Sequence, residues 1–313
     1  MSRILITGGA GYIGSVLVPM ILLNTVHEII VIDNFMYRQT SLLDCCHKKR
    51  LVIVRGDARN EELMKKLLAQ NIEFIIPMAA IVGEQACHQD PIKAESTNLE
   101  AIKMLLQIKD KAHKIIFPNT NSGYGIGREG IYCDEETPLN PISLYGRLKV
   151  DAEKLILQTN DSIALRLATV FGISPKMRLD LLVNDLTHDA VKRGYIVLFE
   201  GHFKRNYIHV RDVARAFMHC MQNFEIMKNQ VYNVGLSDAN LSKRELCEEI
   251  KKQVPNLRII EDDIMKDPDK RNYIVSNEKI EKTKFKPQFS LQEGITELIK
   301  GYQIIRNNKF SNI

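Results

Sequence analysis

Two side chains spaced four residues apart, Tyr145 and Lys149, could together do acid–base chemistry. At that spacing on a helix they lie one above the other on the same face. An ammonium group beside a phenol favours the phenolate, so Lys149 would lower the pKa of Tyr145 toward neutral and make it a usable general base. The same spacing is also that of an ordinary contact on a helix surface. The rest of the chain has to decide between these two interpretations.

A glycine-rich loop near the start of the chain indicates a nucleotide-binding site. Residues 3–7 are an apolar run typical of a buried parallel strand, and Gly8, Gly11 and Gly14 follow it before a predicted helix over residues 15–23. Glycine is required where the backbone turns sharply, approaches a pyrophosphate and packs helix against strand. The N-terminus of the helix then presents backbone N–H groups to the phosphates.

Two acidic residues, each following a predicted strand, indicate which dinucleotide binds. Residues 28–32 predict a strand that ends in Asp33, roughly twenty residues after the glycine loop. A carboxylate there accepts hydrogen bonds from both ribose hydroxyls and would repel a 2′-phosphate, so NAD is favoured over NADP. The alternative is that Asp33 caps the strand end. Asp57, after a strand over residues 51–54, is either an acceptor for the adenine amino group or a turn-forming residue.

The next elements complete the predicted cofactor site. A strand over residues 73–76 leads to Ala79 and Ala80, which are small enough to let a cofactor lie close. Asn98, on a long predicted helix over residues 91–111, could reach back to the strand ends. The residues expected around the cofactor are Gly8, Gly11, Tyr12, Ile13, Gly14, Asp33, Asn34, Asp57, Ala58, Met78, Ala79, Ala80, Asn98, Tyr145 and Lys149.

Thr120 joins the candidate catalytic residues. It follows a strand over residues 114–117, which places it at the carboxyl end of a parallel strand, the edge where open α/β sheets bind their ligands. A helix over residues 145–158 and a strand over residues 163–167 come next. We therefore predict an α/β fold with a Rossmann-type parallel sheet and helices on both faces.

The domain organisation predicted from this pattern has two parts. Residues 1–168 would form the NAD-binding domain, and residues 169–313 mainly a smaller α/β substrate-binding lobe, with some segments interleaved with the first domain. Strand signals are sparse in the second part, so segments 205–212 and 267–273 are expected to be loops. Asp212 would cap a helix that follows it.

Composition and charge exclude several other classes of protein. The 313 residues carry a formal net charge of +5 without a dense Lys/Arg tract, so no nucleic-acid partner is expected. Six cysteines without metal-ligand spacing favour a reduced intracellular protein with no metal site. The longest apolar run, residues 16–23, is too short to cross a bilayer, and no leader-like pattern precedes the first strand. The expected location is the cytoplasm.

Taken together, these features resemble the extended short-chain dehydrogenase/reductases of the NAD-dependent epimerase/dehydratase family, whose members act on nucleotide sugars. The resemblance covers essentially the whole chain. It rests on residues that recur in order and at matching separations: Gly8, Gly11, Gly14, Asp33, Asp57, Thr120, Tyr145 and Lys149. It implies that Tyr145 takes the proton from a sugar hydroxyl and that Thr120 hydrogen-bonds the reacting oxygen. Lys149 would bind the nicotinamide ribose and hold down the pKa of Tyr145.

The resemblance also implies a substrate site. Arg205 and Arg271 match arginines that clamp a substrate diphosphate, a task that suits a bidentate guanidinium, although each alone could form a surface ion pair. Asn121 and Ser122 stand where the dehydratases of the family carry an acid pair, so elimination of water is not expected. The expected substrate contacts are Asn121, Ser122, Thr169, Asn184, Arg205 and Arg271.

Within the family, segments 118–125, 167–172 and 177–184 look most like enzymes of bacterial capsule pathways that act on GDP-D-glycero-manno-heptose. That likeness implies oxidation of the C4 hydroxyl to a ketone, with tightly held NAD reoxidised by a 2-oxo acid such as 2-oxoglutarate. Two alternatives stay open, a 4-epimerase that uses the same residues and, more remotely, a non-catalytic NAD-sensing regulator. The family also implies a homodimer, packed through helices that correspond to residues 98–111 and 145–158.

Overall fold

A seven-stranded parallel sheet forms the centre of the protein. The computed structural model describes residues 2–262 and 270–305. The strand order is β11-β7-β5-β4-β1-β2-β3, and every neighbouring pair is parallel. The inner strands are buried on both faces, as expected of parallel strands covered by helices. The bounds are β1 (Arg3–Thr7), β2 (Glu28–Asp33), β3 (Leu51–Arg55), β4 (Ile72–Pro77), β5 (Lys114–Thr120), β7 (Ser162–Leu167) and β11 (Gln230–Val234).

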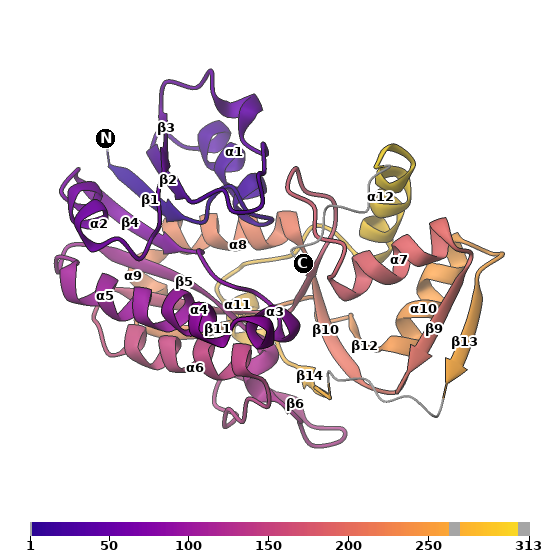
Figure 1. Cartoon of the computed structure of the whole chain (residues 1–313). Helices are drawn as coiled ribbons and strands as arrows, with labels where there is room; N and C mark the ends of the chain where they lie inside the picture. Colours follow the sequence, from indigo (N-terminus) through magenta and orange to yellow (C-terminus); the bar gives the residue numbers. More distant parts are fainter. Residues whose placement is uncertain (1, 263–269, 306–313) are drawn as a thin grey trace.

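Helices cover both faces of this sheet (Figure 1). On one face α1 (Gly14–Asn24) packs against α8 (Val210–Gln222), and their apolar side chains belong to a core that continues into the C-terminal part of the chain. On the other face α2 (Glu61–Leu68), α5 (Ala101–Ile108) and α6 (Leu144–Leu157) bury a second apolar cluster. The predicted α/β fold with helices on both faces is confirmed.

The helix predicted over residues 91–111 contains an irregular turn. It begins as α4 (Pro91–Glu95), passes through a π-helical segment, η2 (Ser96–Glu100), and continues as α5 only to Ile108. A π-helical turn holds one extra residue, so it changes the direction of the side chains around it. The side chain of Asn98 lies on this turn.

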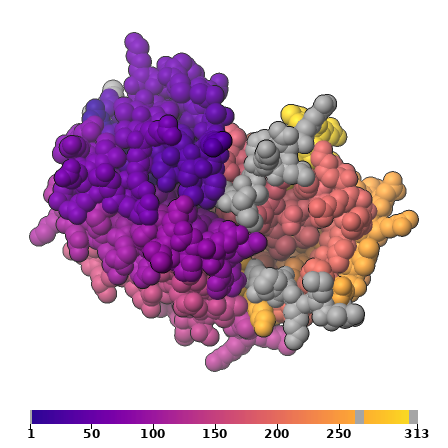
Figure 2. Space-filling model, in the orientation of Figure 1, coloured from indigo at the N-terminus to yellow at the C-terminus, as the bar shows by residue number. Residues whose placement is uncertain are grey.

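A smaller lobe lies beside the sheet, drawn in salmon to yellow next to the indigo and purple N-terminal half in Figure 2. It contains a three-stranded sheet, β12-β10-β8, and a parallel pair, β13-β9, while β14 pairs with β6. The bounds are β6 (Tyr132–Cys133), β8 (Thr169–Phe171), β9 (Tyr195–Phe199), β10 (Lys204–His209), β12 (Asn240–Ser242), β13 (Arg258–Asp262), β14 (Ile274–Val275), α7 (Leu182–Lys192), α10 (Lys243–Gln253) and α12 (Leu291–Ile304). The remaining short helices are η1 (Leu43–Cys45), α3 (Glu84–Gln89), η3 (Asn121–Tyr124), α9 (Phe224–Met227) and α11 (Glu278–Lys282).

The prediction that segment 205–212 is a loop is wrong. The segment forms most of β10 and the first turn of α8. The N-terminal half of β10 pairs with β12 and its C-terminal half pairs with β8, so its strand conformation depends on partners far away in the sequence. In the second expected loop, residues 267–269 lie outside the described part of the chain, and Asn272 forms an isolated bridge with Ile126.

The predicted capping role of Asp212 is also wrong. α8 begins at Val210, and the side chain of His209 caps it by accepting a hydrogen bond from the Arg211 N–H. Asp212 lies inside the first turn, fully buried, and accepts hydrogen bonds from the backbone N–H groups of Gln288 and Phe289 at 2.9 Å each. It therefore anchors the segment that leads into α12.

The sheet draws on both parts of the predicted division. β11 comes from beyond residue 168, yet it completes the sheet beside β7, and α8 covers one of its faces. The boundary between residues 168 and 169 stays a prediction, with β11 and α8 among the interleaved segments. None of the helices within residues 2–262 and 270–305 has the length and apolar character needed to cross a membrane.

Candidate active site

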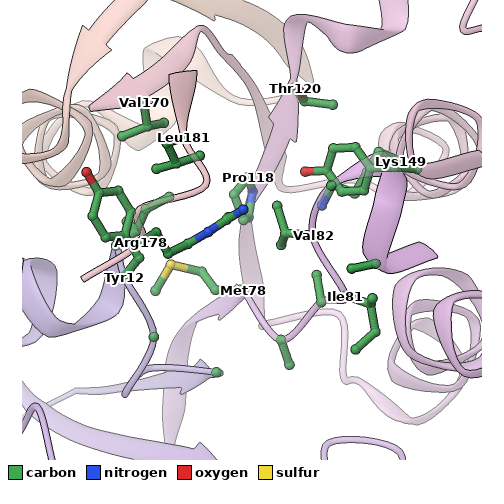
Figure 3. Close-up of a pocket in the computed structure, with 18 of the residues that line it drawn as sticks. Tyr12, Met78, Ile81, Val82, Pro118, Thr120, Lys149, Val170, Arg178 and Leu181 are labelled. Carbon is green, nitrogen blue, oxygen red and sulfur yellow. The ribbon is translucent and has the colours of Figure 1, made fainter. Parts of the chain in front are cut away.

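A cavity of about 910 Å³ lies where the carboxyl ends of the sheet strands face the smaller lobe. Figure 3 shows Thr120 and Lys149 on one side of it and Tyr12, Val170 and Leu181 on the other. Most of the residues predicted from the sequence line this single space: Gly8, Gly11, Tyr12, Ile13, Gly14, Asp33, Asn34, Asp57, Ala58, Met78, Ala79, Ala80, Thr120, Ser122, Tyr145, Lys149, Thr169, Arg205 and Arg271.

The glycine loop between β1 and α1 leaves room for a phosphate group. Gly8 has a φ of +67°, and a Cβ at this position would lie 2.8 Å from the backbone of Ala79, so a side chain fits neither the conformation nor the space. A Cβ on Gly11 would have one neighbouring atom within 4 Å, the carbonyl oxygen of Gly8 at 3.1 Å. The backbone of the loop therefore borders the cavity directly, which fits a dinucleotide pyrophosphate at the N-terminus of α1.

Asp33 at the end of β2 both caps the strand and borders the cavity. Its carboxylate accepts hydrogen bonds from the N–H groups of Ala10 (3.0 Å) and Phe35 (2.8 Å) and from the Gln39 amide (3.1 Å). Burial raises its pKa, and these three donors oppose that rise. A carboxylate held in this way between the glycine loop and the end of β2 fits the ribose of an adenosine.

The contacts of Asp57 are those of a turn-forming residue. It accepts a hydrogen bond from the Arg59 N–H at 2.9 Å, and its carboxylate pairs with the Arg59 guanidinium at 2.7 Å. The hydrogen bonds from Arg59 lower the pKa of Asp57. Both residues line the cavity, so the adenine-binding role remains a prediction.

The three candidate catalytic side chains come from two elements. Thr120 is the last residue of β5, and its hydroxyl accepts a hydrogen bond from the Ser122 N–H (3.1 Å) and donates one to the Ser122 hydroxyl (2.9 Å). Tyr145 and Lys149 lie on α6, whose start is fixed by Ser143, which accepts a hydrogen bond from the Gly146 N–H at 3.0 Å. The ammonium nitrogen of Lys149 lies 3.9 Å from the centroid of the Phe117 ring on β5.

The electrostatics of this group differ from the expectation. Burial raises the pKa of Tyr145 to about 12, and the charges that oppose the rise belong to Arg178 and Arg271. Burial also lowers the pKa of Lys149 to about 7, against the opposing charge of Glu153. The prediction that Lys149 brings the pKa of Tyr145 toward neutral is therefore wrong for this structure. Desolvation raises the pKa of the tyrosine and also lowers the fraction of Lys149 that is protonated.

Arg178 is a cavity residue that the sequence reading missed. It is buried, and its Nε donates to Asp180 at 3.1 Å. Figure 3 shows its side chain crossing the cavity from the side of Tyr12 toward Pro118. The sequence holds a weak signal, an arginine two residues before an aspartate within segment 177–184, but nothing in that spacing shows that the pair faces the cofactor site.

A group of cations lines the cavity on the side of the lobe. Arg271 donates a hydrogen bond to the Ser122 hydroxyl, next to Thr120. Arg205 donates to the carbonyl oxygen of Lys204 at 2.8 Å, and its guanidinium lies 5.5 Å from the centroid of the Tyr273 ring. Lys243, a further residue missed from the sequence, joins them from the start of α10. Such a group suits an anionic substrate.

Three of the predicted contact residues lie outside the lining of the cavity: Asn98, Asn121 and Asn184. Asn98 accepts a hydrogen bond from the N–H of Ile81 and donates one to its carbonyl oxygen, both at 2.8 Å, so it supports a cavity residue from behind. Asn121 is buried. Asn184 donates to the Arg178 carbonyl oxygen at 2.8 Å and to the Tyr12 hydroxyl at 3.3 Å. Its side chain therefore supports residues of the cavity wall.

Comparisons with known proteins agree with this geometry. The profile of the family described as "NAD dependent epimerase/dehydratase family" matches residues 4–235. A protein from Methanocaldococcus jannaschii named putative UDP-glucose 4-epimerase is 26% identical over 307 residues, covering 95% of this chain and 97% of that protein.

Solved structures share the fold. UDP-glucuronic acid 4-epimerase from Bacillus cereus, in complex with UDP-glucuronic acid and NAD, has a TM-score of 0.86 at 22% identity and covers 96% of this chain and 99% of its own. dTDP-glucose 4,6-dehydratase from Bacillus anthracis, in complex with NAD, has a TM-score of 0.84 at 23% identity and covers 99% of both chains.

Proposed function

The chain belongs to the NAD-dependent epimerase/dehydratase family, and from that premise we propose that it oxidises the C4 hydroxyl of a nucleotide-activated sugar to a ketone. One observation carries the proposal. Thr120, Tyr145 and Lys149 line the same cavity as the glycine loop and Asp33, so an acid–base group and a dinucleotide site share one space. NAD, when bound there, supplies the acceptor for the hydride that leaves the sugar carbon.

The protein's own residues then handle the hydroxyl proton. Tyr145 takes the proton, and Thr120 donates a hydrogen bond to the oxygen as it becomes a carbonyl. Burial raises the pKa of Tyr145 to about 12, and the positive charges of Arg178 and Arg271 on the cavity wall limit that rise and so favour the phenolate. Lys149 would donate to the ribose of the nicotinamide nucleoside.

We assign the substrate class from the cations on the lobe side. Arg205, Lys243 and Arg271 would bind the diphosphate of the nucleotide sugar. The segment resemblance to heptose enzymes supports GDP-D-glycero-manno-heptose as the sugar, with a 2-oxo acid such as 2-oxoglutarate taking the hydride back from the cofactor. Asn121 and Ser122 lack the acid groups that elimination of water requires, which argues against a dehydratase.

A second outcome, 4-epimerisation, is favoured by the names of the relatives. The Methanocaldococcus jannaschii relative is named as a UDP-glucose 4-epimerase, and the Bacillus cereus structure is a UDP-glucuronic acid 4-epimerase. An epimerase would use Thr120, Tyr145 and Lys149 for the same oxidation, then return the hydride to the other face of the keto sugar. The two outcomes differ in whether the ketone leaves.

Mass spectrometry of the product separates these outcomes. The purified protein is incubated with GDP-D-glycero-manno-heptose, UDP-glucose or UDP-glucuronic acid, each with and without 2-oxoglutarate. A sugar lighter by two hydrogens, formed in step with 2-hydroxyglutarate, supports the dehydrogenase. An unchanged mass with an inverted C4 supports the epimerase. Binding of NAD without turnover of any sugar, and no difference from Tyr145→Phe, would instead support the NAD-sensing regulator.

We also propose that the protein forms a homodimer. The faces concerned are those of α5 and α6, which correspond to the paired helices of the family. Light scattering on the eluting protein measures the mass directly: twice the 35.8 kDa of the chain supports the dimer, and the mass of a single chain contradicts it.

A further inference from the structure

A buried carboxylate lies directly behind the candidate catalytic residues. Glu153 on α6 is 2% exposed. It accepts hydrogen bonds from two guanidinium nitrogens of Arg166, Nη2 at 2.7 Å and Nε at 3.1 Å, and from the amide of Asn119. A carboxylate taken this far from water is stable only when its oxygens are satisfied, and here three donors satisfy them.

The position of Glu153 joins three elements of the active site. On α6 it lies four residues after Lys149, so the two side chains share one face of the helix. Asn119 immediately precedes Thr120 on β5, and Arg166 lies on the neighbouring strand β7. One carboxylate thus connects the helix that carries Tyr145 and Lys149 to the strand that carries Thr120.

The far side of Arg166 is held away from the cavity. Its Nη1 donates to the Tyr124 hydroxyl at 3.1 Å and to the carbonyl oxygen of Glu135 at 3.2 Å. The Tyr124 hydroxyl in turn donates to Asn233 on β11 at 2.8 Å. Arg166 is therefore fixed on the side of Glu153 that faces β11, and it does not line the cavity that Lys149 lines.

Lys149 is the group on which the carboxylate acts. Burial lowers the pKa of Lys149 to about 7, and Glu153 is the charge that opposes this. The ammonium nitrogen of Lys149 also lies over the Phe117 ring on β5, and the charged or titratable groups that act on Tyr145, one turn before it on α6, are Arg178, Cys87, Arg271 and Tyr273. Near neutral pH a small change in the surrounding charge therefore decides whether the amine is protonated.

We propose that Glu153 is a positioning residue of the active site: its buried carboxylate favours the charged form of the Lys149 amine and fixes α6 against the strand that carries Thr120. This inference rests on the proposed function for its consequence in catalysis. The effect of Glu153 on the titration of Lys149 can be measured without any substrate.

The test is a lysine-selective ¹³C NMR titration of the full-length protein, with the Lys149 signal identified by its loss in Lys149→Met. In the wild type the signal should titrate near pH 7. In Glu153→Gln, which keeps an oxygen acceptor but removes the charge, the midpoint should fall by about one pH unit or more. Arg166→Lys is the matched control, because it disturbs the same buried pair but keeps both charges. Its midpoint should stay at the wild-type value.

Equal midpoints in the wild type and Glu153→Gln, or equal shifts in Glu153→Gln and Arg166→Lys, would overturn the proposal. If Glu153→Gln alone does not fold, because Arg166 is left unpaired in the interior, the double variant Glu153→Gln/Arg166→Met removes both charges and should show a fall in the Lys149 midpoint that is smaller than that expected for Glu153→Gln, since the repulsion from Arg166 is removed as well.

Where turnover is measurable, the pH at which kcat stops rising is set by Lys149, because its pKa lies below that of Tyr145, and this pH should move to a lower value in Glu153→Gln alone. Absence of turnover with every sugar would contradict the proposed function, yet it would leave the titration result unchanged.

Discussion

Two ion clusters in the described part of the chain have similar chemistry and different surroundings. In the first, Glu153 pairs with Arg166 beneath the catalytic edge of the sheet. In the second, Glu297 on α12 bonds to His209 at 2.7 Å and to Arg211, which lie at the junction of β10 and α8. Each carboxylate joins elements that are distant in the sequence. The first shares a helix face with Lys149, whereas no member of the second lines the cavity.

The difference indicates that an ion cluster affects catalysis only when its neighbours include residues of the active site. The ring of His209 stacks on Phe289 with centroids 4.7 Å apart and meets Phe171 edge to face at 5.4 Å. Nothing in that packing transfers a proton to a ligand. The Glu297 cluster should therefore influence the stability of the fold, and the residues around Glu153 should influence activity. The following predictions test that contrast.

The largest effect should come from Tyr145→Phe on the catalytic side. Removal of the oxygen that, as phenolate, accepts the substrate proton should lower kcat by roughly 10²- to 10⁴-fold, the usual range for a general base. The melting temperature should stay close to that of the wild type, because the aromatic ring still fills its site. Steady-state kinetics and thermal unfolding on the same preparation check both parts. A loss of kcat below tenfold would remove Tyr145 from the mechanism.

Glu297→Gln should lower the stability of the fold and leave kcat unchanged, the opposite of Tyr145→Phe. Burial tends to raise the pKa of Glu297, but hydrogen bonds from His209 and Arg211 outweigh it and hold the pKa at about 2, below the ordinary 4.5. A shift of that size corresponds to at most about 3 kcal/mol of the free energy of unfolding. Urea unfolding at pH 7 should show a loss of this order, with kcat per folded molecule unchanged. Glu278→Gln, in an exposed pair with Lys282, is the matched control and should cost less than about 0.5 kcal/mol.

The stability of the wild type should also depend on acid through Glu297. A carboxyl whose pKa is lowered in the folded state stabilises the protein above its unfolded value of 4.5, and this contribution disappears as the pH falls through 4.5 toward 2. Urea unfolding followed from pH 6 to pH 2 should show the decline. In Glu297→Gln the decline should be shallower, and identical slopes in the two proteins would contradict the assignment.

A smaller effect is expected at Arg178, whose ion pair with Asp180 faces the cavity. Removal of its charge in Arg178→Met should raise the pKa of Tyr145 further, so less phenolate forms and kcat at pH 7 should fall by about tenfold. Arg178→Lys, which keeps the charge, should restore most of the rate at saturating NAD. An unchanged kcat in Arg178→Met would assign the support of Tyr145 to Arg271 alone.

The sequence predicted those parts of the site that depend on short spacings. Gly8, Gly11, Gly14 and Asp33 could be placed because a strand, a loop and a helix in direct succession determine their positions. Thr120 could be placed because it directly follows an apolar strand. All of these residues line the cavity.

Features that depend on contacts distant in the sequence could not be predicted. Arg205 lies on a strand because β8 and β12 pair with it, and Arg178 and Lys243 reach the cavity only because the lobe folds over the sheet edge. The pKa of Tyr145 was predicted with the wrong sign of shift, since spacing on a helix gives the distance to Lys149 but not the degree of burial.

The late position of β11 in the chain has a consequence for how the protein can be made and divided. A ribosome completes β1 to β7 well before residues 230–234 emerge, and until then the backbone of β7 has no partner on its outer side. An unpaired strand edge of this kind invites pairing with other chains. A fragment that stops at residue 168 should therefore aggregate during expression, whereas one that extends through Val234 carries its own edge strand.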